Sequence, residues 1–368
     1  MRSSELDFFD VKGCGVTVEA TIAVLRHANG LRALQGYLSG LELRSGVGWE
    51  QVQANLALHI ENEDLTEEDL HEFVIDVHSR AHKLVSLYNV SKRTQTELWA
   101  MAKQAALEDV NDVDFPWLLD AQALEELDET PRHIYTRKTE RGYELFFTSA
   151  RMGHDTDDIP IEAIAPKERP NYQNAARMIV ERIVRRQAFD VVFIPADSEE
   201  MVQIRVDTGN IAAKDRDAVR AHLETIVVAT AGIKNVAFQP LNLFPAVRSI
   251  YDDDDAGRVT ALNFNYASGS LTHKVRRTAD GQKDLRKDPF HVGGVTRVNK
   301  KNMMIYFLSV ELEDEGLEEP EPLVVTLPGA VRHLNGQSLQ AFEVEAFASE
   351  AAIAYAVGVI FDHVNEAP

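Results

Sequence analysis

The sequence Arg258-Val-Thr-Ala-Leu-Asn-Phe-Asn-Tyr266 alternates apolar and polar residues with the period of two that is typical of a β-strand. Turn-forming residues follow in Ala267-Ser-Gly-Ser270, and Leu271–Arg277 has the composition of a returning strand. The apolar segment Met303–Val310 predicts a further strand in the centre of a sheet. Residues 258–313 therefore predict a hairpin, a loop over 278–294 and a buried strand.

Basic residues are concentrated between this hairpin and the buried strand. Residues 273–301 carry nine Lys and Arg against three Asp, a net charge of +6 in a chain whose net charge is −21. Cationic side chains on an exposed ribbon and loop bind phosphate oxygens through charge-assisted hydrogen bonds. The alternative is that they pair with acidic segments of the same chain or keep the loop hydrated. The predicted phosphate ligands are Arg276, Arg277, Lys283, Arg286, Lys287, His291 and Arg297.

A second basic face is predicted on residues 170–187. Apolar residues recur there with the period of a helix, as in Ala176, Ile179 and Ile183. We therefore expect an amphipathic helix with basic residues on its outer side. The residues of this second face are Arg182, Arg185 and Arg186.

Composition sets limits on fold and location. A length of 368 residues with 45% hydrophobic content allows two or three domains with substantial cores. A single cysteine, Cys14, excludes an internal disulfide and a cysteine-based zinc site. The first residues lack the apolar segment of a signal peptide, and the longest apolar run, Ala351–Phe361, is too short to span a bilayer. We expect a soluble, cytoplasmic protein with no membrane contact.

Charge is distributed unevenly along the chain. Residues 1–130 have a net charge of −14, residues 131–309 of +4 and residues 310–368 of −11. An acidic molecule repels phosphates at long range, which argues against indiscriminate binding of nucleic-acid duplexes. A local basic groove remains compatible with binding of an anion.

The chain predicts an α+β fold, in which a mainly helical N-terminal region precedes a mixed domain with a largely antiparallel sheet. Helical patterns extend from Leu31 to Asp128, including a capping box at Thr66–Asp69 and a helix continuing from it through Tyr88. Thr130-Pro131 then marks a boundary, which gives an acidic helical domain (1–130) and a mixed α+β domain (131–368). The second domain begins with a predicted hairpin, His133–Lys138 and Tyr143–Thr148, and ends with a helix over Ser349–Asn365.

Motifs for chemistry are incomplete. Gly13-Cys14-Gly15 lacks the third glycine of a dinucleotide fingerprint, and the spacing of His71, His78 and His82 is more typical of partly packed histidines than of one metal site. His154-Asp155 falls in a predicted loop. The acidic turn Asp252–Asp255 matches the start of a calcium loop but lacks the Glu at its twelfth position. The candidate metal ligands are therefore Asp252 and Asp254, and no catalytic residue is predicted.

Three functions are compatible with these features. The first is a binding or regulatory protein that engages an anionic partner, a nucleic acid or a nucleotide, through the basic hairpin and loop. The second is a phosphoester hydrolase dependent on a divalent metal, using Asp252–Asp255, Asp284, Asp288 and His291. The third is a protein-interaction scaffold in which the acidic region 31–128 docks a basic partner or covers the chain's own basic residues. A subunit of a bacterial defence or regulatory complex would suit the first or third function.

Overall fold

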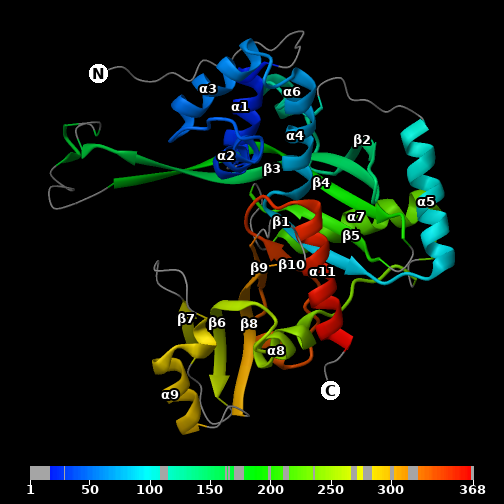
Figure 1. The fold of residues 1–368 in the computed structure, drawn as a ribbon, viewed down its shortest axis with the longest axis vertical. Helices are drawn as coiled ribbons and strands as arrows, with labels where there is room; N and C mark the ends of the chain where they lie inside the picture. Colours follow the sequence, from blue (N-terminus) through cyan, green and yellow to red (C-terminus); the bar gives the residue numbers. More distant parts are fainter. Residues whose placement is uncertain are drawn as a thin grey trace.

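The computed structural model describes residues 17–28, 30–107, 115–161, 164, 166–169, 178–197, 200–209, 215–234, 237–266, 272–276, 284–298, 302–313 and 322–365. Its centre is one ten-stranded sheet in which each pair of neighbouring strands is antiparallel. Helices precede the sheet, cover both its faces and close the fold (Figure 1). The predicted α+β fold class is confirmed. In spatial order the strands are β2 (Arg132–Lys138), β3 (Gly142–Ile159), β4 (Met178–Pro195), β5 (Val202–Asp207), β1 (Lys83–Tyr88), β10 (Phe342–Val344), β9 (Leu323–Leu327), β8 (Met303–Leu312), β6 (Arg258–Tyr266) and β7 (Thr272–Arg276).

Four helices form the N-terminal part of the molecule, drawn in blue in Figure 1. They are α1 (Val18–His27), α2 (Leu31–Gly40), α3 (Trp49–Glu61) and α4 (Glu67–Arg80). Their apolar faces meet in a common core, for example through Leu25, Leu34 and Leu56. The predicted capping box is present: the Thr66 hydroxyl accepts from the backbone N–H of Asp69, and the Asp69 carboxylate accepts from that of Thr66.

The helix predicted through Tyr88 instead ends at Arg80. The backbone is extended at Ala81, has a positive φ of 51° at His82 and continues as β1. Every residue of β1 is buried, because Val85 and Leu87 face one core and Leu84 and Tyr88 face another. Burial on both faces removes the alternating pattern that identifies a strand. Since β1 lies between β5 and β10, the predicted boundary at residue 130 separates this strand from both of its neighbours.

A long two-stranded ribbon projects from one side of the sheet (Figure 1). β3 and β4 pair continuously from Gly142 opposite Pro195 to Ile159 opposite Met178. The neighbouring strands stop earlier, since β2 reaches Thr148 and β5 reaches Val191. The helix predicted over 170–187 is therefore wrong for residues 178–187, and His154-Asp155 lies in a strand and not in a loop. Residues 170–177 lie outside the described residues.

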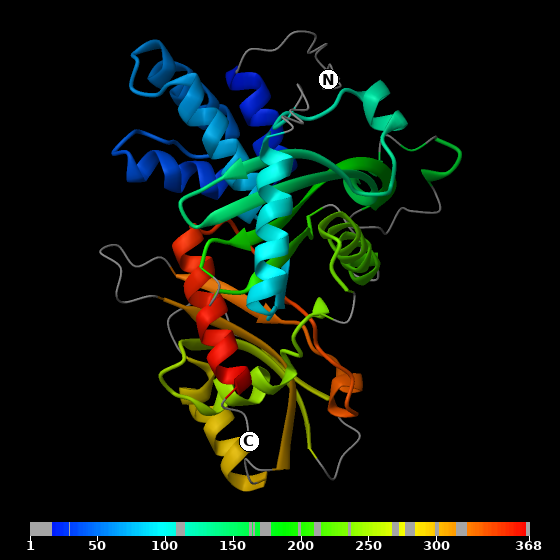
Figure 2. The same ribbon diagram turned by 90° about the vertical axis from the view of Figure 1, so that its right-hand side faces the viewer.

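The remaining helices pack around the sheet, and in Figure 2 α5 (cyan) and α11 (red) both lie in front of its strands. α5 and α7 pack on the face formed by β3, β4, β5 and β1, whereas α8 and α11 pack on the other half of the sheet. The loop predicted over 278–294 instead contains a 3₁₀ helix over 285–287 and, from Pro289, the start of a helix. The helices are α5 (Lys92–Leu107), α6 (Ala121–Glu126), α7 (Arg216–Ala231), α8 (Phe244–Asp252), the 3₁₀ helix η5 (Leu285–Lys287), α9 (Pro289–Val298), α10 (Val331–Leu334) and α11 (Glu350–Asn365).

The stretch that predicts the sheet is largely confirmed. β6 spans Arg258–Tyr266 and pairs with β7 as a hairpin. On its other edge β6 pairs with β8, and β8 in turn pairs with β9. α11 packs against these strands through Ile353 and Ile360, as expected for a closing helix. None of the described helices is both long enough and apolar enough to cross a membrane.

Candidate functional site

Five of the predicted phosphate ligands, Arg276, Arg286, Lys287, His291 and Arg297, lie at the end of the sheet formed by β6, β7, η5 and α9. Lys274 on β7 and Lys287 in η5 have exposed side chains. Arg276 ends β7 and Arg297 lies in α9, whereas Arg277 and Lys283 lie outside the described residues. The structure therefore brings two exposed lysines to this end of the sheet.

Arg286 has a structural role at this end of the sheet. Its Nε donates to Asp284 Oδ2 at 2.8 Å, and both side chains are buried. Its two Nη atoms donate to the backbone carbonyls of Asp253 and Gly257. These contacts fix the turn between α8 and β6. Because the guanidinium is occupied internally, Arg286 is not available as the predicted phosphate ligand.

His291 is also held inside the fold. Its Nε2 lies 2.8 Å from the hydroxyl of Tyr251, and its ring packs against Phe264. Burial raises the pKa of Tyr251 to about 12, so the hydroxyl stays protonated at neutral pH. The predicted role of His291 as a phosphate donor from an open loop does not fit this buried position.

The acidic turn after α8 is engaged with neighbouring side chains. Asp252 pairs with Arg248 one helical turn earlier, and Asp253 Oδ2 lies 3.5 Å from His363 Nε2. In the described part of the chain no group of three or more His, Cys, Asp or Glu side chains is arranged to hold a metal ion. Asp252 and Asp254 therefore lack an assembled set of ligands among these residues.

Ser249, His363 and Asp253 form a chain of polar contacts that sequence reasoning did not find. Ser249 Oγ lies 2.8 Å from His363 Nδ1, on the other side of the imidazole from Asp253. The residue types match those of serine hydrolases, but Ser249 lies inside α8, and its carbonyl accepts a backbone bond from Asp253. The three residues therefore join α8 to α11. No local motif signals this contact, because 114 residues separate Ser249 from His363.

A buried layer of charges lies under α4 and the start of α11, and no sequence pattern predicted it. Arg205 on β5 is fully buried and donates to both carboxylate oxygens of Glu350, at 2.8 and 3.1 Å. Its Nε donates to Gln203 at 2.9 Å. Burial raises the pKa of Glu350, but the charge and hydrogen bonds of Arg205 outweigh this, and the net pKa is lowered. Glu350 is therefore ionised at neutral pH.

A second buried group lies next to this layer, on β1, β3, β4 and β5. Arg151 pairs with Asp190, whose other oxygen accepts from the backbone N–H of Asp207 at 2.9 Å. Lys83 Nζ donates to the carbonyl of Phe189 at 2.6 Å, and burial lowers the pKa of this amine. Burying charges is costly unless they are paired and hydrogen-bonded. Arg151 and Asp190 offset one another, although Arg151 Nε has no hydrogen-bond partner among the described residues, and Lys83 is bound by a backbone carbonyl.

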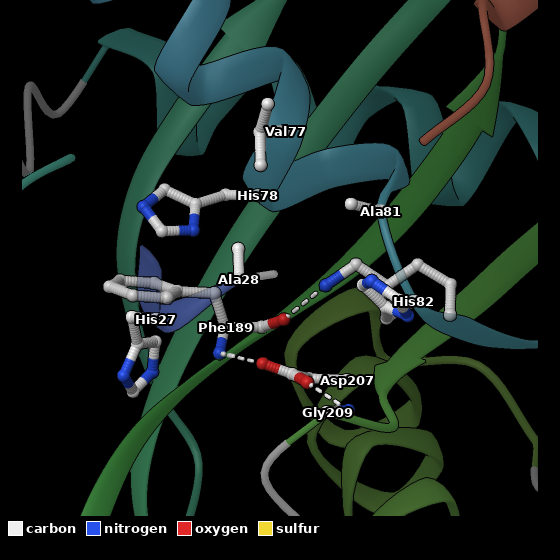
Figure 3. A pocket seen from close by; sticks show the side chains of 10 residues that line it. His27, Ala28, Val77, His78, Ala81, His82, Phe189, Asp207 and Gly209 are labelled. Carbon is white, nitrogen blue, oxygen red and sulfur yellow. Dashed lines mark hydrogen bonds between the residues drawn. The ribbon is translucent and has the colours of Figure 1, made fainter. Parts of the chain in front are cut away.

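A small cavity opens beside this second group (Figure 3). His27, His78, His82, Lys83 and Asp207 contribute to its lining, and its free volume of about 10 Å³ holds about one water molecule. His78 Nε2 lies 2.8 Å from the carbonyl of Pro116, and burial lowers the pKa of His78 to about 3. Asp207 accepts from the backbone N–H groups of Phe189 and Gly209. The polar groups have internal partners, so the arrangement stabilises the fold and offers no space for a substrate.

The end of the α2–α3 hairpin exposes apolar side chains. Val47 is 86% exposed and Leu58 is 52% exposed. The loop between the helices runs along α3, since Val47 N donates to Gln51 Oε1 at 2.9 Å and Asn55 Nδ2 donates to the carbonyl of Ser45. One stripe of α3 contains Gln51, Asn55 and Leu58 at helical spacing. Val47 lies in the loop at the start of this stripe, and Leu58 lies near its end. We call this surface the α2–α3 tip; its exposed carboxylates are Glu42, Glu50, Glu61, Glu63 and Asp64.

The second predicted basic face lies on the ribbon, where Arg185 alternates with Arg182 and Arg186 between its two faces. Arg182 stands opposite Asp155 in the strand register, and Arg186 opposite Arg151. Arg185 donates to the carbonyls of Leu124 and Leu127 at the end of α6, where a cation complements the helix dipole. The three arginines therefore do not form a continuous cationic surface. No protein-family model, curated protein or solved structure matches this chain.

Proposed function

We propose that this chain is a protein-interaction scaffold, and that the α2–α3 tip docks a partner segment with apolar side chains and basic flanks. The observation that carries the proposal is the exposure of Val47, in the loop before α3, and of Leu58, in the last turn of α3. Apolar side chains grouped on a surface and rimmed by polar residues are typical of protein–protein sites. Burying them is favourable by about 1.5–3 kcal/mol for each side chain.

The carboxylates around the tip determine the type of partner. The α3–α4 turn contributes three of them, Glu61, Glu63 and Asp64, and all three are exposed. An acidic rim increases the association rate of a basic partner and disfavours acidic ones. The partner is therefore a protein with Lys or Arg next to its apolar contact residues.

Affinity capture from the cells that produce the protein tests this proposal. We expect a basic protein to bind the tagged chain, to be lost from the variant Val47→Ser with Leu58→Ser, and to be weakened by salt. Leu107→Ser is the matched control, because Leu107 is 70% exposed at the end of α5. Equal capture by the wild type, the tip variant and the control would refute a role for the tip.

An anionic partner is the second candidate, supported by the exposure of Lys274 and Lys287 at the same end of the sheet. Lysines on an open strand edge and on the neighbouring 3₁₀ helix are placed to contact phosphates. The test is binding of labelled DNA and RNA over a salt series, with Lys274→Glu and Lys287→Glu combined. We expect weaker binding and a flatter salt dependence in the variant. Unchanged binding by the variant would exclude this surface as the site.

A further inference from the structure

Residues 44–47, in the loop between α2 and α3, are fixed by side chains of the two helices. The N–H of Val47 donates to Gln51 Oε1 at 2.9 Å, and the carbonyl of residue 45 accepts from Asn55 Nδ2. The carbonyl of residue 46 accepts from Gln35 Nε2 on α2 at 2.8 Å. The backbone of the loop is therefore bound on its inner side, while the side chain of Val47 is exposed.

His59 completes this set of contacts from the last turn of α3. Its Nε2 lies 2.9 Å from the carbonyl oxygen of Arg44, at the start of the loop. Its Nδ1 lies 3.2 Å from Asp64 Oδ2, in the turn between α3 and α4. The side chain of His59 is 12% exposed and that of Asp64 is 43% exposed. A partly buried imidazole thus connects the loop before α3 to the turn after it.

The backbone of the α3–α4 turn positions Asp64 for this contact. Glu63 has a positive φ of 60°, a left-handed conformation that reverses the chain at the end of a helix. The N–H of Asp64 then donates to the carbonyl of His59 at 2.9 Å. The carboxylate is therefore placed beside the ring of the same residue that its backbone binds.

Both ring nitrogens of His59 face oxygens that can only accept a hydrogen bond. A backbone carbonyl has no proton to donate, and neither has an ionised carboxylate. An imidazolium has two N–H groups and can bind both oxygens, whereas a neutral imidazole has one N–H and can bind only one. A hydrogen bond to the ionised acceptor is the stronger of the two, so a neutral ring keeps Asp64 and loses the carbonyl of Arg44.

We infer that His59 is a pH-dependent switch for the α2–α3 tip, which holds the start of the loop as an imidazolium and releases it as a neutral ring. Histidine is the side chain whose charge ordinarily changes between pH 5 and 8. The other charged residues of the two segments that the ring connects are carboxylates and one guanidinium, which ordinarily keep their charge over this range. They are Glu42, Arg44, Glu61, Glu63 and Asp64.

The switch deepens the scaffold function proposed above and rests on it. Val47 lies in the loop that the switch holds, and Leu58 precedes His59 in α3. A partner that docks on a fixed loop does not have to order it, and this lowers the entropic cost of binding. Affinity for the partner should therefore be highest where His59 is an imidazolium and should fall as the pH rises.

The mobility of a nitroxide spin label at residue 44 tests the switch without any partner. The label is attached to Arg44→Cys, made together with Cys14→Ser, because the Arg44 side chain is exposed and its carbonyl is kept. The spectrum should show slow motion at pH 6 and faster motion at pH 8.5. His59→Gln should remove this difference, because an amide does not titrate. A label at Ala57→Cys, exposed on α3 itself, should give the same spectrum at both pH values.

Circular dichroism establishes that each labelled variant is folded at both pH values. Equal mobility at residue 44 at pH 6 and pH 8.5 would overturn the inference. So would a pH-dependent change that His59→Gln leaves intact, because another group would then cause it.

Capture of the partner at the same two pH values tests the link to docking. Capture by the unlabelled chain should be about two- to tenfold weaker at pH 8.5 than at pH 6, the effect of one net hydrogen bond. His59→Gln should make capture equal at both values, whereas His222→Gln, on the exposed side of α7, should keep the dependence of the wild type.

The two experiments separate the switch from the scaffold function. If capture requires Val47 and Leu58 but does not change with pH, the scaffold function stands and the inference is overturned. If the label at residue 44 responds to pH through His59 but capture does not require Val47 and Leu58, the scaffold function fails and the switch in the loop stands.

Discussion

Arg205 and Glu350 are separated by 145 residues and form a bidentate ion pair between β5 and the first turn of α11. The pair is the inner end of a network that continues through Glu144 to Arg137, which also contacts Asp76 on α4. α4, β5 and α11 are thereby held together by charges that have little contact with water. The network connects the N-terminal helices, the middle of the sheet and the last helix.

Removing one partner of this pair should destabilise the whole fold. Glu350→Ala leaves the fully buried Arg205 guanidinium without its main partner, and an uncompensated buried charge costs about 3–5 kcal/mol. Chemical denaturation should show a lower midpoint with little change in slope. Glu97→Ala, which breaks the exposed pair with Arg93, should cost less than about 1 kcal/mol. Equal effects of the two variants would contradict the burial of the Arg205 pair.

Protonation of His78 should make stability depend on pH. Burial lowers the pKa of His78 from 6.5 to about 3, so above pH 6.5 the imidazole is neutral in both the folded and the unfolded chain. Between pH 6.5 and about 3 only the unfolded chain binds the proton, and stability falls by up to about 1.4 kcal/mol per pH unit. His78→Phe keeps the contact with the ring of Phe189 and should reduce this slope.

The control for the pH experiment is His222→Gln, because His222 is exposed on α7. The free energy of unfolding of each variant is measured by denaturant titration at several pH values from 4 to 7. The His222 variant should follow the wild type. A His78→Phe variant with an unchanged slope would show that other groups cause the acid sensitivity.

The sequence predicted those elements whose residues have one buried and one open face. β6 alternates clearly, and α11 has a regular apolar stripe, whereas the hairpin of β2 and β3 was predicted although residues 143–150 of β3 are all buried. β1 was missed because it is buried on both faces, so its residues have no alternation to detect. The outer part of β4, residues 178–187, was predicted as a helix because Ile179 and Ile183 are four residues apart, a spacing that fits a helix as well as one face of a strand.

The candidate site was less predictable than the fold. A cluster of basic residues shows the local charge but does not show which guanidinium is occupied, as the contacts of Arg286 with residues 253 and 257 demonstrate. The ion pair of Arg205 with Glu350 depends on β5 and α11 meeting in space, which no local pattern specifies. The exposure of Val47 likewise depends on how the loop runs along α3.

Substitutions at Arg286 and Lys287 should show that the buried cation contributes much more to the free energy of unfolding than the exposed one. Arg286→Ala removes a buried cation that pairs with Asp284 and holds the turn before β6, and should cost about 3–5 kcal/mol in unfolding free energy. Lys287→Ala changes an exposed side chain and should alter stability by less than about 0.5 kcal/mol. Thermal and chemical unfolding measure both. A stable Arg286→Ala protein would contradict the anchoring role of the guanidinium.

Replacing two glycines near β6 and α9 with alanine should change the stability of the protein in opposite directions. Gly257 has φ of +86°, and an added Cβ would lie 2.5 Å from the carbonyl oxygen of Glu311. Gly257→Ala should therefore destabilise the protein by at least about 1–2 kcal/mol. Gly293 lies in α9 with no atom within 4 Å of a Cβ position, so Gly293→Ala should stabilise it by about 0.5–1 kcal/mol. Unfolding midpoints decide the sign of each change.

The central position of β1 has a consequence for synthesis on the ribosome. One neighbour of β1, β5, ends at Asp207 and the other, β10, at Val344, so the sheet remains open along one side of β1 until residue 344 has been translated. At about 5–20 residues per second, the interval between the emergence of Tyr88 and that of Val344 is on the order of 10–50 s. During that interval one edge of β1 is unpaired in the nascent chain, whereas helices α1 to α4 have already been translated. Folding of the sheet is thus coupled to the translation of β10, and a ribosome that stalls before residue 344 holds a chain with its central strand incompletely paired.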